Sequence, residues 1–213
     1  MTEREPPQPQ DRAVAPLPVS ADPLTILVMG TSLSAGTAWP DRAARMLTRC
    51  LGRTVGIIRL AEPGADIRWG LARLDAAVAA APDIVLIEFA TNDADILDGP
   101  SAATSARLTA ELTDRLAAAL PGARLVLMTM NPVNGLARRL QRPRLAAHNR
   151  DYRSLAERGD LGLVDLAPRW ARLDDLGAAL PDGLHPSDAA AEAVILPALV
   201  SYLGRVAGAT CEG

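Results

Sequence analysis

The stretch Ile84-Val-Leu-Ile-Glu-Phe89 decides the fold, because nearly every position in it is apolar. A strand with one solvated face alternates apolar and polar residues, whereas a strand covered on both faces does not. Four further short apolar segments are predicted strands and fall at residues 24–29, 54–60, 125–130 and 163–164. We therefore predict a parallel sheet of five strands with helices on both faces.

Longer Ala/Leu/Arg-rich segments separate these strands and predict the helices. They cover residues 41–51, 67–80, 101–120, a segment that reaches about residue 158, and 188–203. Parallel crossovers are right-handed in nearly all proteins, so the alternation predicts a doubly wound, three-layer α/β/α fold of the flavodoxin-like kind. Ligands of such folds bind outside the carboxyl ends of the strands, which is where we look for functional residues.

Length and composition indicate a single domain with short extensions. The chain has 213 residues and 49% hydrophobic residues, enough for one large core. Residues 1–22 contain five prolines among polar residues, and we expect a mobile leader there. The domain is predicted to span residues 23–206, and residues 207–213 form a flexible tail.

The charge of the chain argues against a nucleic-acid partner. The net charge is −3, and all 22 basic residues are arginine. Two arginine clusters stand out, Arg138-Arg139 and Arg142-Pro-Arg144. Such clusters are most often solvated helix faces, and the alternative is a contact for an anionic substrate.

The cysteines and the apolar runs set expectations about compartment. Cys50 and Cys211 lie far apart without a CxxC motif, so we expect neither a metal site nor a disulfide framework. Cys50 is interpreted as a small buried apolar residue and Cys211 as part of a polar tail. The start of the chain resembles no secretory signal, and the apolar run 193–200 is interrupted by Pro197. These features predict a cytoplasmic protein without a membrane span.

A serine follows the first predicted strand at the edge where ligands bind. Ser32 lies between Gly30 and Gly36, and these glycines permit a sharp turn that exposes its hydroxyl group. Ser32 is therefore a candidate nucleophile, and its backbone N–H is a candidate oxyanion donor. The simpler interpretation is a helix N-cap or a turn. Neither a G-x-S-x-G elbow nor a glycine-rich phosphate loop is present.

Two further candidates follow the second and third strands. Gly64, after Pro63, lets a backbone N–H approach a ligand, although the same residues form ordinary strand–helix turns. Asn92 can donate its side-chain amide to developing negative charge, or it can form an Asx-turn. Asp93 and Asp95 are interpreted as capping or solvating residues of that loop.

The candidate base lies in the loop before the last helix. Asp182 precedes His185 by three residues, so the carboxylate can orient the imidazole while its other nitrogen takes a proton from Ser32. A structural loop histidine is the alternative. His148, the only other histidine, falls in a helical pattern and is assigned a packing role. Two distant histidines without clustered acids predict no metal site.

These segments resemble the SGNH/GDSL hydrolase superfamily of serine esterases. Gly30-Thr-Ser-Leu33 is similar to the GDSL block, Gly64 to the oxyanion glycine, Asn92 to the oxyanion asparagine, and Asp182-x-x-His185 to the final block. The resemblance covers about residues 24–203. Thr31 stands where the family usually has Asp, and Ala90 stands where the third block usually has Gly.

The resemblance implies ester hydrolysis through an acyl-enzyme on Ser32, with no metal or organic cofactor. The implied substrate is a small-molecule or saccharide ester, either a short acyl ester or an acetylated carbohydrate. Trp39 and the segment 132–144 are candidate pocket residues. The alternatives are an inactive SGNH-like module that binds an acylated saccharide or a partner protein, and a flavodoxin-like nucleotide binder. Thioester and lipid substrates and the oligomeric state stay open.

Overall fold

The computed structural model describes residues 7–17 and 23–212. The strands are β1 (Leu24–Gly30), β2 (Val55–Ala61), β3 (Ile84–Glu88), β4 (Arg124–Thr129) and β5 (Gly162–Asp165). The longer helices are α2 (Trp39–Leu51), α6 (Ala102–Ala119), α8 (Leu145–Arg158) and α11 (Asp188–Val206). The short helices are α1 (Ser32–Ala35), α3 (Ile67–Ala72), α4 (Leu74–Ala79), α5 (Ala90–Asp93), α7 (Leu136–Gln141), α9 (Ala167–Trp170) and α10 (Leu176–Ala179).

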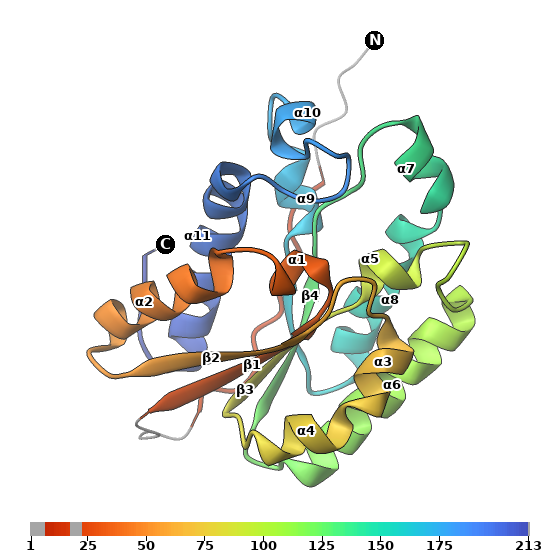
Figure 1. Ribbon diagram of the computed structural model, residues 1–213. Helices are drawn as coiled ribbons and strands as arrows, with labels where there is room; N and C mark the ends of the chain where they lie inside the picture. The colour runs from red at the N-terminus through yellow and green to blue at the C-terminus, as the bar shows by residue number, and fades with distance from the viewer. Residues whose placement is uncertain (1–6, 18–22, 213) are drawn as a thin grey trace.

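The five strands form one parallel sheet in the order β2-β1-β3-β4-β5 (Figure 1). Gly30 pairs with Ala61 of β2 and with Glu88 of β3, so these three strands end at the same level. The predicted fold class, a doubly wound α/β/α sheet, is therefore confirmed. The loops that follow β1, β2 and β3 emerge together at the carboxyl edge of the sheet.

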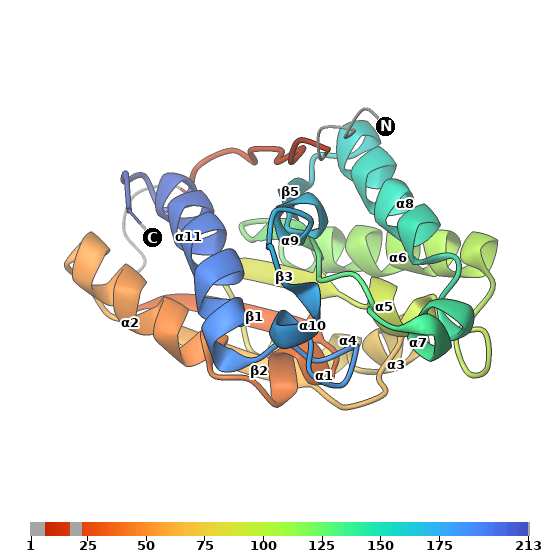
Figure 2. The same ribbon diagram turned by 90° about the horizontal axis from the view of Figure 1, so that it is seen from above.

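Helices cover both faces of the sheet, as the apolar strands predict. In Figure 2, α2 and α11 lie on one side of the strands, and α3, α4, α6 and α8 lie on the other. Along β1, Ile26 and Val28 pack into the first layer, whereas Leu27 and Met29 pack into the second. Successive side chains of a strand point to opposite faces, so an entirely apolar strand supplies both cores at once.

Two predicted helices are each interrupted in the structure. The segment 67–80 divides at Arg73 into α3 and α4, and the segment before Arg158 divides into α7 and α8. The second interruption has a local cause. Arg142 precedes Pro143 and has φ −125° and ψ 53°, outside the α-helical region, because a following proline ring disfavours helical backbone.

Residues 7–17 follow a defined course along the domain, where the sequence predicts a mobile leader. The backbone of Arg12 exchanges hydrogen bonds of 3.0 and 2.9 Å with Leu163 of β5. The Tyr202 hydroxyl donates to the Arg12 carbonyl over 2.7 Å. A free sheet edge offers unpaired backbone groups, which explains how part of a proline-rich segment can pair with β5. The rest of the predicted leader, 1–6 and 18–22, lies outside the described residues.

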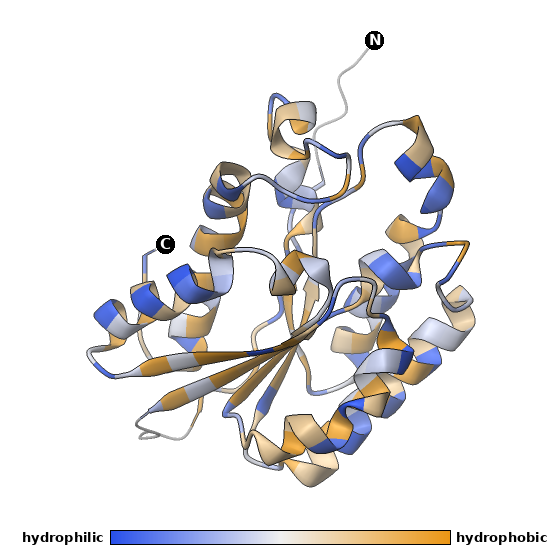
Figure 3. Cartoon of the chain, in the orientation of Figure 1, coloured by the Kyte–Doolittle hydropathy of each residue, from blue (hydrophilic) through white to orange (hydrophobic). Residues whose placement is uncertain are grey.

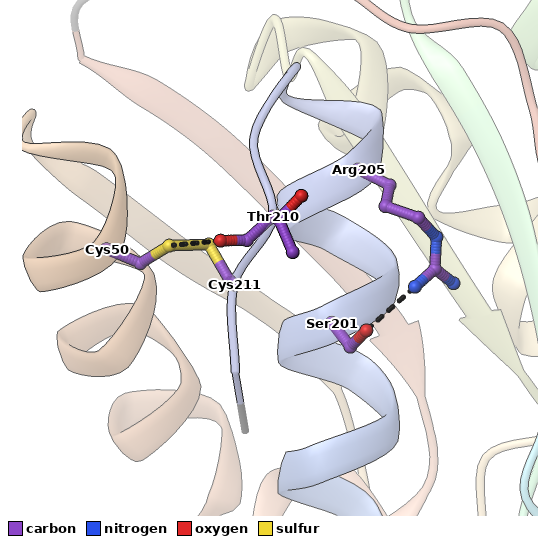
Figure 4. The surroundings of a disulfide bond; sticks show 5 residues. All are labelled: Cys50, Ser201, Arg205, Thr210 and Cys211. Atoms are coloured by element: carbon purple, nitrogen blue, oxygen red, sulfur yellow. Dashed lines mark hydrogen bonds between the residues drawn. A yellow bond between two sulfur atoms is a disulfide. The ribbon is translucent and has the colours of Figure 1, made fainter.

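The two cysteines form a disulfide, so the expectation of unpaired cysteines is wrong. Cys50, at the C-terminal end of α2, is exposed rather than buried, and Cys211 is buried (Figure 4). The helices α2 and α11 pack side by side, which brings the segment after α11 to the end of α2 and the two Cα atoms to 5.8 Å. Sequence spacing alone does not contain this packing.

Helix α11 is the one helix of the described chain that is long and apolar enough to cross a membrane by length and composition. It has 19 residues, but 61% of its apolar window is buried inside the protein. Leu199, Val200 and Leu203 are buried in the first core layer. Its apolar character is therefore that of a core helix.

Candidate active site

The turn between β1 and α1 holds Ser32 at the carboxyl edge of the sheet. Thr31 is the N-cap of α1, and its hydroxyl accepts a hydrogen bond from the Leu33 N–H over 3.1 Å. A threonine at this position thus performs the local capping that a short polar side chain supplies at helix starts. Ser32 is the first residue of α1 and projects from a fixed turn.

A buried carboxyl group, which the sequence reading missed, underlies this turn. Glu88 ends β3 and accepts from the Thr31 N–H over 2.7 Å and from the Ser34 hydroxyl over 2.6 Å. The Thr31 hydroxyl lies 3.0 Å from its second oxygen. Burial raises the Glu88 pKa to about 7, although these hydrogen bonds oppose the shift. The sequence does contain a signal for this buried group, because Glu88 is the one acidic residue in an otherwise apolar strand.

Gly30 leaves the space that Glu88 occupies. A Cβ atom at this position would lie 2.2 Å from the Glu88 Oε1 atom. Any larger residue would therefore displace the carboxyl group that binds the Thr31 N–H. The glycine of the nucleophile segment is required for close packing of β1 against β3, in addition to any freedom that it gives the turn.

The loop 180–187 is folded around the Asp182 carboxylate. One oxygen, Oδ1, accepts from the Leu184 N–H over 2.9 Å and from the His185 N–H over 2.7 Å. Gly183 has φ +77°, in the left-handed region that favours glycine. The aspartate therefore shapes the loop with one oxygen and leaves the other for the imidazole.

The segment after β4 supports this loop from the side. The buried Asn131 side chain donates to the Leu184 carbonyl over 2.7 Å. The Asn134 N–H donates to the Gly183 carbonyl over 2.8 Å. These contacts fix a loop that has no regular secondary structure of its own.

A line of hydrogen bonds joins the three predicted triad residues. Ser32 Oγ lies 2.9 Å from His185 Nε2, and His185 Nδ1 lies 2.7 Å from Asp182 Oδ2. Burial opposes ionisation of Asp182, but its hydrogen bonds with His185 and Leu184 hold its pKa well below the usual range. Asp182 is thus a carboxylate at neutral pH, and its contact with Nδ1 leaves Nε2 of the imidazole facing the Ser32 hydroxyl.

The two predicted oxyanion residues lie in adjacent loops that are tied to each other. Gly64 has φ +81° in the turn after β2, and a Cβ there would meet no atom within 4 Å. The Asn92 amide, in α5, donates one N–H to the Ala65 carbonyl over 2.8 Å. A primary amide has two N–H groups, so one stays available for a ligand.

Asp93 fastens the helix that carries Asn92, and it is buried rather than solvated. Its Oδ1 accepts from the Ile67 N–H over 2.9 Å, and its Oδ2 accepts from the Ser105 hydroxyl over 2.5 Å. Burial raises the Asp93 pKa to about 6. The carboxyl group therefore joins α5 to α3 and α6. Asp95 is also buried and pairs with Arg142 over 3.0 Å.

The remaining candidates lie outside the site. His148 is buried, and its Nδ1 lies 3.3 Å from the Ser105 hydroxyl, in agreement with a packing role. Trp39, a predicted pocket residue, is buried in the core: it is 1% exposed and donates from its indole to the Leu33 carbonyl over 2.9 Å. No group of three or more His, Cys, Asp or Glu residues in the described chain is arranged to hold a metal ion.

Comparison with protein families identifies the chain. Residues 27–193 match the GDSL-like lipase/acylhydrolase family. The chain belongs to this family. As a GDSL-like acylhydrolase it is an esterase-type enzyme, as the sequence predicts. A comparison with curated proteins gives no match.

Solved structures of similar fold include a lipase/acylhydrolase, an acetylxylan esterase and TesA. A lipase/acylhydrolase from Enterococcus faecalis has a TM-score of 0.74 and 21% identity, over 89% of this chain and 99% of its own. The acetylxylan esterase Axe2 from Geobacillus stearothermophilus has a TM-score of 0.73 and 18% identity, over 86% and 95%. TesA has a TM-score of 0.68 and 26% identity, over 85% and 99%. The first two likenesses concern the fold alone.

Proposed function

We propose that this GDSL-like acylhydrolase cleaves carboxylic esters of short acyl groups or acetylated carbohydrates through an acyl-enzyme on Ser32. The observation that carries the proposal is the hydrogen-bonded line from Ser32 Oγ through His185 to Asp182. A serine hydroxyl is a weak nucleophile until an adjacent base can take its proton. The family membership and the acetylxylan esterase among the similar folds support an ester substrate.

The proposed reaction has two halves. His185 Nε2 takes the Ser32 proton while Oγ bonds to the ester carbonyl carbon. The N–H groups of Ser32 and Gly64 and the free N–H of Asn92 stabilise the oxyanion, and each donor of this kind contributes about 3–4 kcal/mol. The imidazolium then protonates the leaving alcohol. Water, deprotonated by His185, attacks the carbonyl carbon of the acyl-enzyme. The bond to Ser32 Oγ then breaks, the imidazolium returns its proton to Oγ, and the acid is released.

The alternative is a catalytically inactive binding module. The residue that favours this alternative is Ala90, which stands where the family usually has glycine. Ala90 lies in the regular helix α5 and is buried. Among the described residues other than glycine, only Ala81 has a positive φ. An alanine therefore fits this position without strain, which supports an intact loop around Asn92 and favours the enzyme.

Labelling by a fluorophosphonate probe tests the nucleophile directly. We expect the wild-type protein to be labelled and to hydrolyse p-nitrophenyl acetate, and Ser32→Ala to lose both. The neighbouring variant Ser34→Ala is the control, because Ser34 binds Glu88 rather than His185 and should keep its label. Labelling that persists in Ser32→Ala would remove the assignment. A panel of p-nitrophenyl esters and acetylated xylan then separates acyl from alcohol preference.

A further inference from the structure

Four large apolar side chains are exposed near the candidate active site. Ile96 and Leu97 follow α5, and Leu136 and Leu140 lie on α7, with exposed fractions of 54, 74, 75 and 63%. We call these four residues the apolar rim. Exposed apolar residues that gather in one place mark surfaces for a partner, a ligand or a membrane.

The two halves of the apolar rim belong to segments that are bonded to each other. The Ile96 N–H donates to the Gln141 carbonyl over 3.0 Å, and the Gln141 side chain donates to Asp95 over 2.7 Å. In Figure 3 the tip of the loop after α5 and the start of α7 are both coloured as hydrophobic, on the same side of the molecule. The segments that carry the four side chains are therefore held next to each other.

The apolar rim flanks the hydrogen-bonded line of the site. The loop with Ile96 and Leu97 directly follows α5, which carries Asn92. On the other side, the Arg138 guanidinium, on α7, donates to the Asp182 carbonyl over 3.3 Å. A partner that binds the apolar rim would thus lie beside the candidate site.

The segment 134–150, which we call the basic segment, contains five arginines and no acidic residue, although the whole chain has a net charge of −3. Arg139, Arg144 and Arg150 are exposed. In the part of the chain that the structure describes, these three form no ion pair with an acidic side chain. Asp98 is the exposed acid of the neighbouring loop.

A cavity of about 630 Å³ lies along the basic segment. Arg139 and Arg150 line it, together with apolar side chains such as Val133 and Leu145. Basic groups beside apolar walls suit a ligand that carries a negative head group and a hydrocarbon part.

We propose that the apolar rim and the basic segment dock this protein on an anionic lipid surface. The arginines are attracted by the negative head groups, and the exposed leucines and isoleucine enter the boundary between head groups and acyl chains. Apolar side chains on a basic surface are typical of protein segments that lie on membranes rather than cross them. Docking here does not depend on ester hydrolysis by Ser32.

Two other occupants explain the surface less well. An acidic polysaccharide would pair with the arginines, but it would not explain why Leu97 and Leu136 are exposed. A second copy of the chain would bring two basic segments together, and like charges oppose such a contact. An anionic lipid surface satisfies both the charge and the apolar side chains.

Sedimentation of the full chain with lipid vesicles tests the proposal. We expect binding to vesicles of phosphatidylcholine mixed with phosphatidylglycerol, little binding to phosphatidylcholine alone, and weaker binding as salt is added. Leu136→Ser with Leu140→Ser should weaken binding about tenfold or more. Each of Arg139→Gln, Arg144→Gln and Arg150→Gln should weaken it about fivefold.

Matched controls use exposed residues away from this surface. Ile58→Ser on β2 and Arg49→Gln on α2 should leave vesicle binding unchanged. Circular dichroism checks that each variant is folded, and the salt and lipid dependence of the wild-type protein tests the proposal without any variant. Ser32→Ala should bind vesicles like the wild type, so loss of esterase activity and loss of docking are read separately.

Several results would overturn the proposal. Equal binding to neutral and anionic vesicles, or none to either, excludes an anionic lipid surface. Binding of polygalacturonate that the arginine variants abolish, without vesicle binding, assigns the basic segment to a soluble polyanion. Light scattering could show a dimer that dissociates in the leucine variants. That result would assign the apolar rim to a contact with a second copy of the chain.

Discussion

Glu88 has no basic partner among the residues that the structure describes, although it holds the nucleophile turn. In the described chain its partners are the Thr31 N–H and hydroxyl and the Ser34 hydroxyl. Asp93 raises its pKa further, and the buried Tyr152 hydroxyl on α8 lies near enough to interact with it electrostatically. The carboxyl group therefore positions Ser32, but its burial disfavours its charged form.

We predict that this group makes the protein less stable at high pH. Its pKa is about 7 in the folded chain against 4.5 for an ordinary glutamate, so the folded state binds the proton more tightly. Its contribution is present below the unfolded pKa and is lost as pH rises through about 7. Between about pH 5 and pH 8 the free energy of unfolding should fall by up to about 3 kcal/mol.

Urea denaturation of Glu88→Gln measures this contribution. The amide is a neutral analogue of the protonated acid, so the variant should lose most of the fall in stability between these two pH values. Asp93, with a pKa raised to about 6, contributes in the same direction, and Asp93→Asn is the comparison that should keep the Glu88 part. Parallel pH profiles for wild type and Glu88→Gln would contradict the prediction.

Asp182→Asn should remove activity and leave the loop folded. The Asn Oδ1 atom can still accept from the Leu184 and His185 N–H groups, but its amide would face His185 Nδ1 and favour the wrong tautomer. We expect kcat for p-nitrophenyl acetate to fall by about 10²–10⁴-fold. Thermal unfolding should change little, and a kcat within about twofold of the wild type would exclude this role.

At the scale of elements, α5 is a single turn that depends on its neighbours. Asp93→Ala should leave the Ile67 N–H without a partner, at about 1–3 kcal/mol, and leave the Ser105 hydroxyl with His148 Nδ1 alone. Because Asn92 is adjacent, we also expect kcat to fall. Ser105→Ala removes only one of the two hydrogen bonds of Asp93 and should cost less in both measurements. Equal denaturation midpoints for the two variants would show that α5 does not depend on Asp93.

The elements also show how far sequence patterns reach. The unbroken apolar run of β3 predicts its place in a covered parallel sheet, and the helices α6 and α11 follow the predicted pattern closely. The sequence pattern did not predict the helix interruptions at Arg73 and Pro143. The spacing of apolar residues continues across each interruption, and only the backbone conformation changes there. The short helix α5 is held by the hydrogen bonds of the Asp93 carboxyl group. Helix propensities do not predict such contacts between distant segments.

At the scale of the whole molecule, the disulfide joins positions 161 residues apart. Cross-links over long loops restrict the unfolded chain, and the typical contribution is about 2–4 kcal/mol. We predict that Cys50→Ser with Cys211→Ser lowers the free energy of unfolding by this amount. Dithiothreitol should do the same to the wild type and have no effect on the double variant.

The same bond bears on the compartment. Disulfides form and persist in oxidising environments and are rare in the cytosol. The expectation of a cytoplasmic protein predicts free thiols in cells. Alkylation of the protein in freshly lysed cells tests it: a protected Cys50–Cys211 pair would place the protein in an oxidising compartment.

The sequence by itself determined the layered parallel fold, the family and the candidate residues Ser32, Asp182 and His185, because apolar patterning and short motifs are local properties. Only the tertiary structure decided the burial of Glu88 beneath the nucleophile turn, the pairing of Cys50 with Cys211, and the gathering of the apolar rim. These features join segments tens of residues apart. Their energies depend on distance and burial, which exist only once the sheet and its two helical layers have assembled.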